Sequence, residues 1–408
     1  MGSDFRYSRG LVFVFIGMQL NTGIKNLIPG LDIVGIIMLV SVLCLIDYDN
    51  LCKIKFYKNG VALGIVLVFQ LLLVLYSLAC DNHTPQLLIY HGYLIALILA
   101  LMTQSITPKF EKFPAVFFYL NGFIALIVLY QATNGFSRLV VSFDNTGKLW
   151  LSEGGDPITM SRTLVMAIIS VFIYKKKNIP VMVIKCIIVI ASWIGLFSFG
   201  NRATILGAII VSILGSISVE SQDKNQKKFQ RWLIKFLMML VVIYVVFTNE
   251  YVSNKLIHFS DNLVIGIKTY FGDFSSGVDA STSTRHMLRG QVIKDFNSRF
   301  GIMTMLFGLG YYYIYLDIPL MQAFIDLGCI GFVFYMFCVL VYPLKYYYRC
   351  FVKRIKTDNV VVWTIVLISI QSSLDQLYCG LPYYYFLWTP SIMLMFFDWH
   401  RRKNNSNS

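Results

Sequence analysis

Several arginines of this sequence stand next to apolar runs, where a guanidinium group is unexpected. Arg202 lies in the tight turn Gly200-Asn201-Arg202, between two such runs. An arginine near hydrocarbon is costly unless it is paired, reaches the interface or serves a function. Its planar set of N–H donors binds phosphate oxygens two at a time. Two interpretations are open: an interfacial arginine that reaches lipid phosphates, or a ligand for a phosphate at the membrane boundary.

Arg162 has a similar position, because it opens an apolar run directly after Ser161. Serine is a typical N-cap residue, so a helix is expected to begin here. Arg162 is then either an anchor at the start of this helix or a second ligand for an anionic group.

Arg285 and Arg289 are four residues apart in a segment, 284–296, that has a helical pattern. A helix would place both on one face, and Val292 falls on nearly the same side. We therefore expect this face of the helix to be partly buried rather than fully exposed to water. Two guanidinium groups held in this way suit a diphosphate, and a salt bridge to a nearby aspartate is the structural alternative.

Acid–base chemistry has two candidates in the same region. Asp317 follows the aromatic run that contains Tyr311 and Tyr312 and directly precedes another apolar run, so it is either a catalytic base or a helix N-cap. His286 is a further candidate for a base, although a histidine in such a position is more often an ordinary loop residue. The eight cysteines show no metal-binding spacing. We therefore expect no metal and no other cofactor.

The elements that must position these residues are membrane-spanning helices. Hydrophobic residues make up 57% of the 408 positions and charged residues 14%, and the mean hydropathy is +0.66. The apolar residues come in blocks of roughly 16–22, the length that a helix needs to cross about 30 Å of hydrocarbon. No alternation typical of a β-barrel is visible. The sequence predicts an all-α polytopic membrane protein.

About twelve spans are predicted, in one membrane domain that covers residues 1–408. We place them near 10–22, 27–47, 61–80, 86–106, 114–133, 161–174, 179–199, 203–219, 232–249, 319–343, 359–377 and 383–399. Two connections on the outer side are longer than the others, about 134–161 and 249–318.

The basic residues predict the orientation. Most Lys and Arg residues, among them Lys175–Lys177 and Arg401–Lys403, fall on one side of the predicted spans, which is therefore the cytoplasmic side. Both termini belong to this side. This distribution also explains the net charge of +14 without a nucleic-acid partner.

Two segments resemble a known family. The run Ser198–Gly207 (SFGNRATILG) is similar to a segment of O-antigen polymerases and of the related O-antigen ligases, and Phe307–Gly331 is similar to a second segment of these proteins. Ile318 stands where the family usually has asparagine. Asp317, at a position that is Asp or His in the family, is more like the polymerases than the ligases.

The resemblance implies a GT-C-like, metal-independent, inverting glycosyltransferase of the bacterial inner membrane. A glycan on undecaprenyl diphosphate would be moved onto another lipid-linked repeat unit at the periplasmic face. Arg202 and Asp317 would be catalytic, and the substrate would be bound by Arg162, Arg285, Arg289, His286, Tyr311 and Tyr312. A polysaccharide chain-length regulator is an expected partner.

Two other functions compete with this expectation. An O-antigen ligase would use similar chemistry with lipid A–core as the acceptor. A flippase or other transporter of lipid-linked oligosaccharides would require charges in mid-span that line a cavity.

Overall fold

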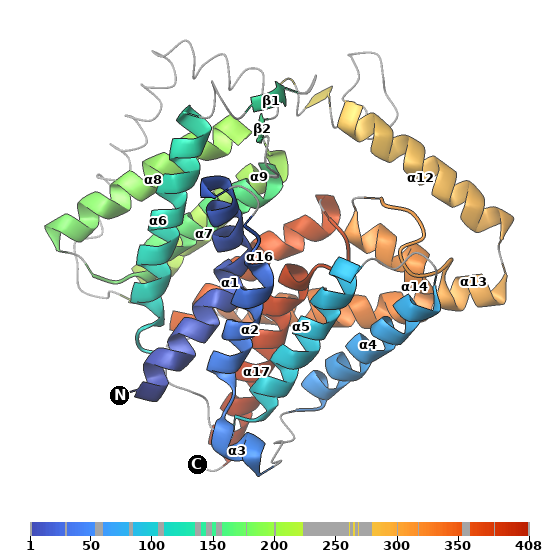
Figure 1. The fold of residues 1–408 in the computed structure, drawn as a ribbon, viewed down its shortest axis with the longest axis horizontal. Coiled ribbons are helices and arrows are strands. Elements are labelled where there is room, and N and C mark those ends of the chain that lie inside the picture. Colours follow the sequence, from blue (N-terminus) through green and yellow to red (C-terminus); the bar gives the residue numbers. More distant parts are fainter. Residues whose placement is uncertain are drawn as a thin grey trace.

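The computed structural model describes residues 2–28, 31–53, 60–80, 85–104, 110–134, 140–143, 149–151, 157–176, 178–199, 201–222, 261, 264–265, 268, 280–299, 301–316, 318–352, 360–378 and 380–406. Apart from one pair of short strands, the regular structure of these residues is helical (Figure 1). The strands β1 (Val140–Phe143) and β2 (Leu149–Leu151) pair antiparallel.

The N-terminal helices are α1 (Gly2–Leu27), α2 (Val34–Leu45), α3 (Tyr48–Cys52), α4 (Gly60–Ala79), α5 (Pro85–Met102) and α6 (Phe113–Asn134). The central ones are α7 (Pro157–Ile173), α8 (Ile179–Phe199), α9 (Arg202–Gln222), α12 (Ala280–Ser298) and α13 (Ile302–Phe307). The C-terminal part has α14 (Pro319–Met336), α15 (Tyr342–Tyr347), α16 (Val360–Tyr378) and α17 (Tyr385–Ser406). The π-helical segment Phe337–Val341 joins α14 to α15, and a second one, Tyr348–Val352, extends α15.

Six helices of the described residues are long and apolar enough to cross a membrane. They are Val61–Ala79, Pro85–Met102, Phe113–Tyr130, Ile179–Phe197, Pro319–Cys350 and Val360–Leu377, and Val34–Leu45, Ile158–Ile173 and Ala203–Ser216 are shorter apolar helices. These are the helices of a multi-pass membrane protein. The predicted span 232–249 lies outside the described residues.

One predicted span is shorter in the structure than in the sequence analysis. The segment 27–47 was expected to be helical throughout, but α2 begins only at Val34. Asp32 accepts a hydrogen bond from the Val34 backbone N–H at 3.1 Å, and Pro29 and Gly30 precede it in the sequence. Residues 31–33 are not helical, so the helix begins later than the sequence analysis predicted.

The exposure of the helices distinguishes a centre from a periphery. In the apolar stretch of α16, 72% of the residues are buried, whereas the value is 33% for α4 and for α8. The exposed residues of α4 and α8 include Leu72, Leu75 and Ile190, which are suited to contact with lipid. Helix α16 thus lies inside the bundle.

The two ends of the bundle carry different parts of the chain. The beginning of α1, the end of α17 and helix α3 lie at the lower end in Figure 1, and the strands and α12 lie toward the upper end. This arrangement agrees with both termini on one side and with the connections 134–161 and 249–318 on the other.

Helix α14 is broken at Gly328, whose φ of 62° and ψ of −170° are not helical. The surrounding apolar stretch Pro319–Cys350 has 32 residues. At about 1.5 Å per residue it is longer than the roughly 30 Å of hydrocarbon. The break divides it, so that Pro319–Leu327 forms a short half-helix at its beginning.

Candidate functional site

A buried ion pair joins α7 and α16. The Arg162 Nε–H donates to Asp375 Oδ2 at 2.8 Å, and the two residues are 8% and 2% exposed. Arg162 lies in the second turn of α7 and Asp375 in the last turn of α16. Within the described residues, these are charged groups inside a bundle of apolar helices, where such groups are rare and commonly functional.

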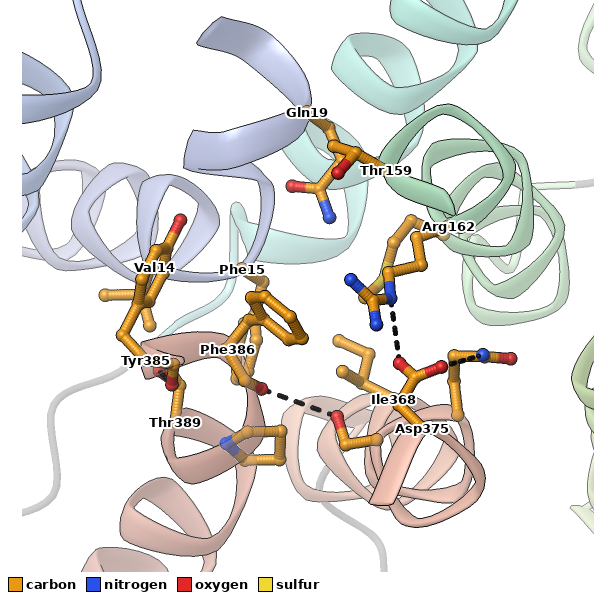
Figure 2. A pocket seen from close by; sticks show the side chains of 14 residues that line it. Val14, Phe15, Gln19, Thr159, Arg162, Ile368, Asp375, Tyr385, Phe386 and Thr389 are labelled. Atoms are coloured by element: carbon orange, nitrogen blue, oxygen red, sulfur yellow. Dashed lines mark hydrogen bonds and ion pairs between the residues drawn. The ribbon is translucent and has the colours of Figure 1, made fainter. Parts of the chain in front are cut away.

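The ion pair lines a cavity of about 30 Å³ between α1, α7, α16 and α17 (Figure 2). The Arg162 guanidinium carbon lies 4.2 Å from the centre of the Phe386 ring, a cation–π contact. Figure 2 shows the two terminal nitrogens of Arg162 directed into the space between Phe386 and Gln19. Gln19, Thr159 and other polar residues add to the lining. The site can therefore accept an anionic group, but the cavity is smaller than the roughly 300–1,000 Å³ of typical ligand pockets.

Asp375 is held in place by Gln371, one turn earlier on α16. The Gln371 Nε2–H donates to Asp375 Oδ1 at 2.9 Å, so each carboxylate oxygen has a partner. The Gln371 Oε1 atom has no donor among the described residues and lies against Gly207 of α9. A Cβ atom at Gly207 would lie 1.8 Å from it. Gly207 therefore provides the room in which the partner of Asp375 sits.

Two glycine contacts relate Arg202 to this site. Gly207, near the start of α9, packs against Gln371 close to the ion pair, which lies near the start of α7. Gly215, later in α9, packs against Phe172 near the end of α7. Helices α7 and α9 therefore run in the same direction. Arg202 is the first residue of α9, five residues before Gly207. At about 1.5 Å per residue its backbone lies at nearly the level of the ion pair. The side chain of Arg202 is outside the part that the structure describes.

A second polar centre surrounds Asp326, which is fully buried in the half-helix before the Gly328 break. Its carboxylate accepts hydrogen bonds from the Tyr383 hydroxyl at 2.6 Å and from the backbone N–H groups of Tyr312 at 3.0 Å and Tyr313 at 3.2 Å. Gln322 Nε2 donates to both carboxylate oxygens, at 3.0 and 2.9 Å. The donors surround the carboxylate and compensate for its removal from water.

Of the predicted aromatic residues, Tyr311 lies inside this centre. It is 1% exposed, its hydroxyl contacts His91 Nε2 at 2.8 Å, and its ring stacks on Tyr383 with centres 4.2 Å apart. Burial, and to a lesser extent the charge of Asp326, raises the pKa of Tyr311, so its hydroxyl stays protonated. The ring packs against other side chains of the protein. Tyr312 is half-buried, with a φ of 54°.

The expected helix over 284–296 is confirmed as α12, Ala280–Ser298. Val292 is fully buried in a small apolar cluster with Leu316 and Ile325, and Arg289 is half-buried. The face that carries Arg289 is therefore not purely solvated, as predicted. The side chains of Arg285 and His286 are outside the described part, and Asp317 is outside it entirely.

Asp375, Asp326 and Tyr383 were not among the site residues that the sequence analysis predicted. The two aspartates had a signal, since each is a carboxylate within an apolar run. The pairing of Arg162 with Asp375 had no signal, because the two residues are 213 positions apart. No group of three or more His, Cys, Asp and Glu residues with metal-binding geometry occurs in the described part of the chain.

No protein-family model, characterised protein or solved structure matches the chain. The candidate site is consequently interpreted from its own chemistry.

Proposed function

We propose that this chain is an O-antigen polymerase, a glycosyltransferase of the bacterial inner membrane that uses glycans linked to undecaprenyl diphosphate. The idea comes from the resemblance of Ser198–Gly207 and Phe307–Gly331 to segments of that family. The observation that carries it is the Arg162 guanidinium, held by Asp375 with its terminal nitrogens directed into a cavity between helices. A group of this kind suits a lipid-linked diphosphate.

In the proposed reaction, a hydroxyl oxygen of the acceptor sugar forms a bond to the anomeric carbon of the donor glycan. The bond from that carbon to the diphosphate oxygen breaks, and its electron pair stays on the leaving undecaprenyl diphosphate. Arg162 stabilises this growing charge, together with Arg202, Arg285 and Arg289. Asp317 accepts the proton of the hydroxyl.

The cavity must widen before a diphosphate can enter, since about 30 Å³ is too small for one. Helices α1 and α17 form part of its wall, and the lipid tails of the substrates have to arrive from the bilayer. We expect these helices to separate when the donor binds.

One observation favours a second function, transport of a lipid-linked oligosaccharide. An ion pair inside the helix bundle that lines a cavity is also what a transporter contains. Arg162 and Asp375 lie close to helix ends rather than at mid-span, which suits a site at the interface better.

The test is elongation by the purified protein in sealed vesicles supplied with repeat units on undecaprenyl diphosphate. The wild-type protein should give a ladder of longer glycans on a gel. Arg162→Ala should abolish the ladder, because the leaving diphosphate loses its cation. Lys345→Ala is the matched control, since this cation pairs with Asp398 on α17 at 2.7 Å, away from the cavity, and its loss should leave the ladder unchanged.

The same vesicles separate the three functions. A ligase would give no ladder but would attach single units to added lipid A–core. A transporter would move the repeat unit across the bilayer and form no new glycosidic bond. A normal ladder from Arg162→Ala, at normal expression, would show that Arg162 is not part of the site.

A further inference from the structure

The Asp326 centre connects two parts of the chain that the proposed function assigns to one site. One is α12, which carries Arg285 and Arg289, and the other is the segment that covers Arg162. The carboxylate of Asp326 accepts hydrogen bonds from the loop on which α12 packs and from Tyr383, which lies in the segment that covers Arg162.

The first connection runs from Asp326 to α12. Asp326 accepts the backbone N–H groups of Tyr312 and Tyr313, and Gln322, one turn earlier, accepts the Leu316 N–H at 2.8 Å and donates to the Ile314 carbonyl at 2.6 Å. Residues 312–316 are thus attached to the half-helix through their backbone.

Helix α12 rests on this attached loop. The buried Val292 of α12 packs with Leu316 of the loop and with Ile325 of the half-helix. The Tyr313 hydroxyl contacts Asp295 Oδ2 of α12 at 3.4 Å, and the Tyr313 ring lies under the Arg299 guanidinium at 5.5 Å. The position of the loop therefore determines the position of α12.

The second connection runs from Asp326 to Arg162. The Tyr383 hydroxyl donates to Asp326 Oδ2 at 2.6 Å. Three residues later in the same segment, Phe386 lies over the Arg162 guanidinium, and its carbonyl accepts from the Ser372 hydroxyl at 3.5 Å. A shift of Tyr383 would therefore reach the ring that covers Arg162.

We infer that Asp326 is a positioning residue that keeps the arginine-bearing helix α12 and the Arg162 cavity in register. The inference rests on the proposed function, in which both arginine groups bind substrate diphosphate. A carboxylate matches the donors that converge here, because an apolar residue would leave the Tyr312 and Tyr313 N–H groups and the Tyr383 hydroxyl buried without an acceptor. A carboxylate that accepts hydrogen bonds from the loop backbone and from the Tyr383 hydroxyl at the same time fixes the position of these two segments relative to each other. An apolar residue cannot do this.

The test combines amide hydrogen exchange and kinetics on the full-length protein in lipid nanodiscs. Asp326→Asn puts an N–H donor where donors already converge, so exchange should become about tenfold faster or more in peptides from α12, from 309–316 and from 383–386. Tyr383→Phe removes one hydroxyl only and should accelerate 383–386 alone. Asp398→Asn is the control, because the buried Asp398 of α17 pairs with Lys345 of α15 and with Arg349, outside both connections.

The kinetic readout is the elongation of repeat units on undecaprenyl diphosphate. Asp326→Asn should lower kcat at least tenfold, and Tyr383→Phe should raise KM several-fold with a smaller change of kcat. The inference is overturned if hydrogen exchange of Asp326→Asn equals that of the wild type, or if it rises equally in α4, α5 and α16.

If Asp326→Asn does not fold, Tyr383→Phe is the deciding variant. Unchanged exchange of residues 383–386 and an unchanged KM would then reject the second connection. If the wild type forms no ladder, the proposed function fails, while the exchange pattern still shows whether Asp326 joins the two parts.

Discussion

At the scale of single residues, burial of the Arg162–Asp375 pair costs hydration free energy, and the same burial places a cation next to a cavity. Each charged group loses most of its hydration, and their attraction compensates for this only while both partners are present. Asp375 also accepts from Gln371, so its second oxygen is not left without a donor. The pair therefore stabilises the fold only as long as both partners are present. The terminal nitrogens of Arg162 point toward the cavity.

Removal of one partner should therefore be worse than removal of both. Arg162→Ala should lower the free energy of unfolding by about 3–5 kcal/mol, because the Asp375 carboxylate stays buried without its cation. The double variant Arg162→Leu with Asp375→Leu should recover most of this loss. Thermal unfolding in detergent measures both.

Activity should not follow stability in this pair. The double leucine variant should be stable and should form no glycan ladder, since no cation remains in the cavity. A double variant that is stable and active would show that the pair has only a structural role.

At the scale of the elements, the break in α14 is what brings Asp326 to its partners. Gly328 has a φ of 62°, and a Cβ atom there would lie 2.4 Å from the Leu306 carbonyl carbon and 2.5 Å from the Gly308 nitrogen. Both neighbours are backbone atoms, so neither can rotate away. The loop after α13 and the half-helix touch through their main chains.

Gly328→Ala should accordingly separate the loop from α14. Strain at a left-handed residue costs about 1–3 kcal/mol, and the backbone clash adds to it. We expect a lower melting temperature and little folded protein. Gly64→Ala on α4 is the matched control, because nothing lies within 4 Å of its added Cβ, and alanine should be neutral there.

Equal melting temperatures of Gly328→Ala and wild type would mean that the two main chains are not in contact. We expect wild type and Gly64→Ala to have similar melting temperatures and Gly328→Ala to have a much lower one.

At the scale of the whole molecule, the sequence predicted the helices better than the site. Apolar runs are a local property of the chain, so most of the predicted helices were placed within a few residues, and six helices of the described residues are long and apolar enough to cross a membrane. Helix α12 was found from its own pattern. The break at Gly328 depends on a main chain that is remote in sequence, namely residues 306–308. Local pattern therefore predicted the span and not its interruption.

The partners of the candidate site had no local signal for the same reason. Arg162 was singled out by its place at the start of an apolar run, but its interaction with Asp375 arises only when α7 packs on α16. Tyr383 was one of many aromatic residues near a predicted interface, where such residues are common. Its bond to Asp326 follows from the packing of α14 against the α16–α17 connection.

The two-sided arrangement of the molecule leads to a last prediction, on membrane orientation. Helix α12 lies toward the end of the molecule opposite α3 (Figure 1). Met287 of α12 is 64% exposed, and Cys52, the last residue of α3, is also exposed. A membrane-impermeant maleimide should therefore label Met287→Cys in intact spheroplasts, because α12 is predicted to be periplasmic. In a protein whose other native cysteines are replaced by serine, Cys52 should react only after permeabilisation, and Cys52→Ser should remove that later signal. Labelling of both positions from the same side would contradict the orientation, and with it a diphosphate site for Arg289 on the periplasmic face.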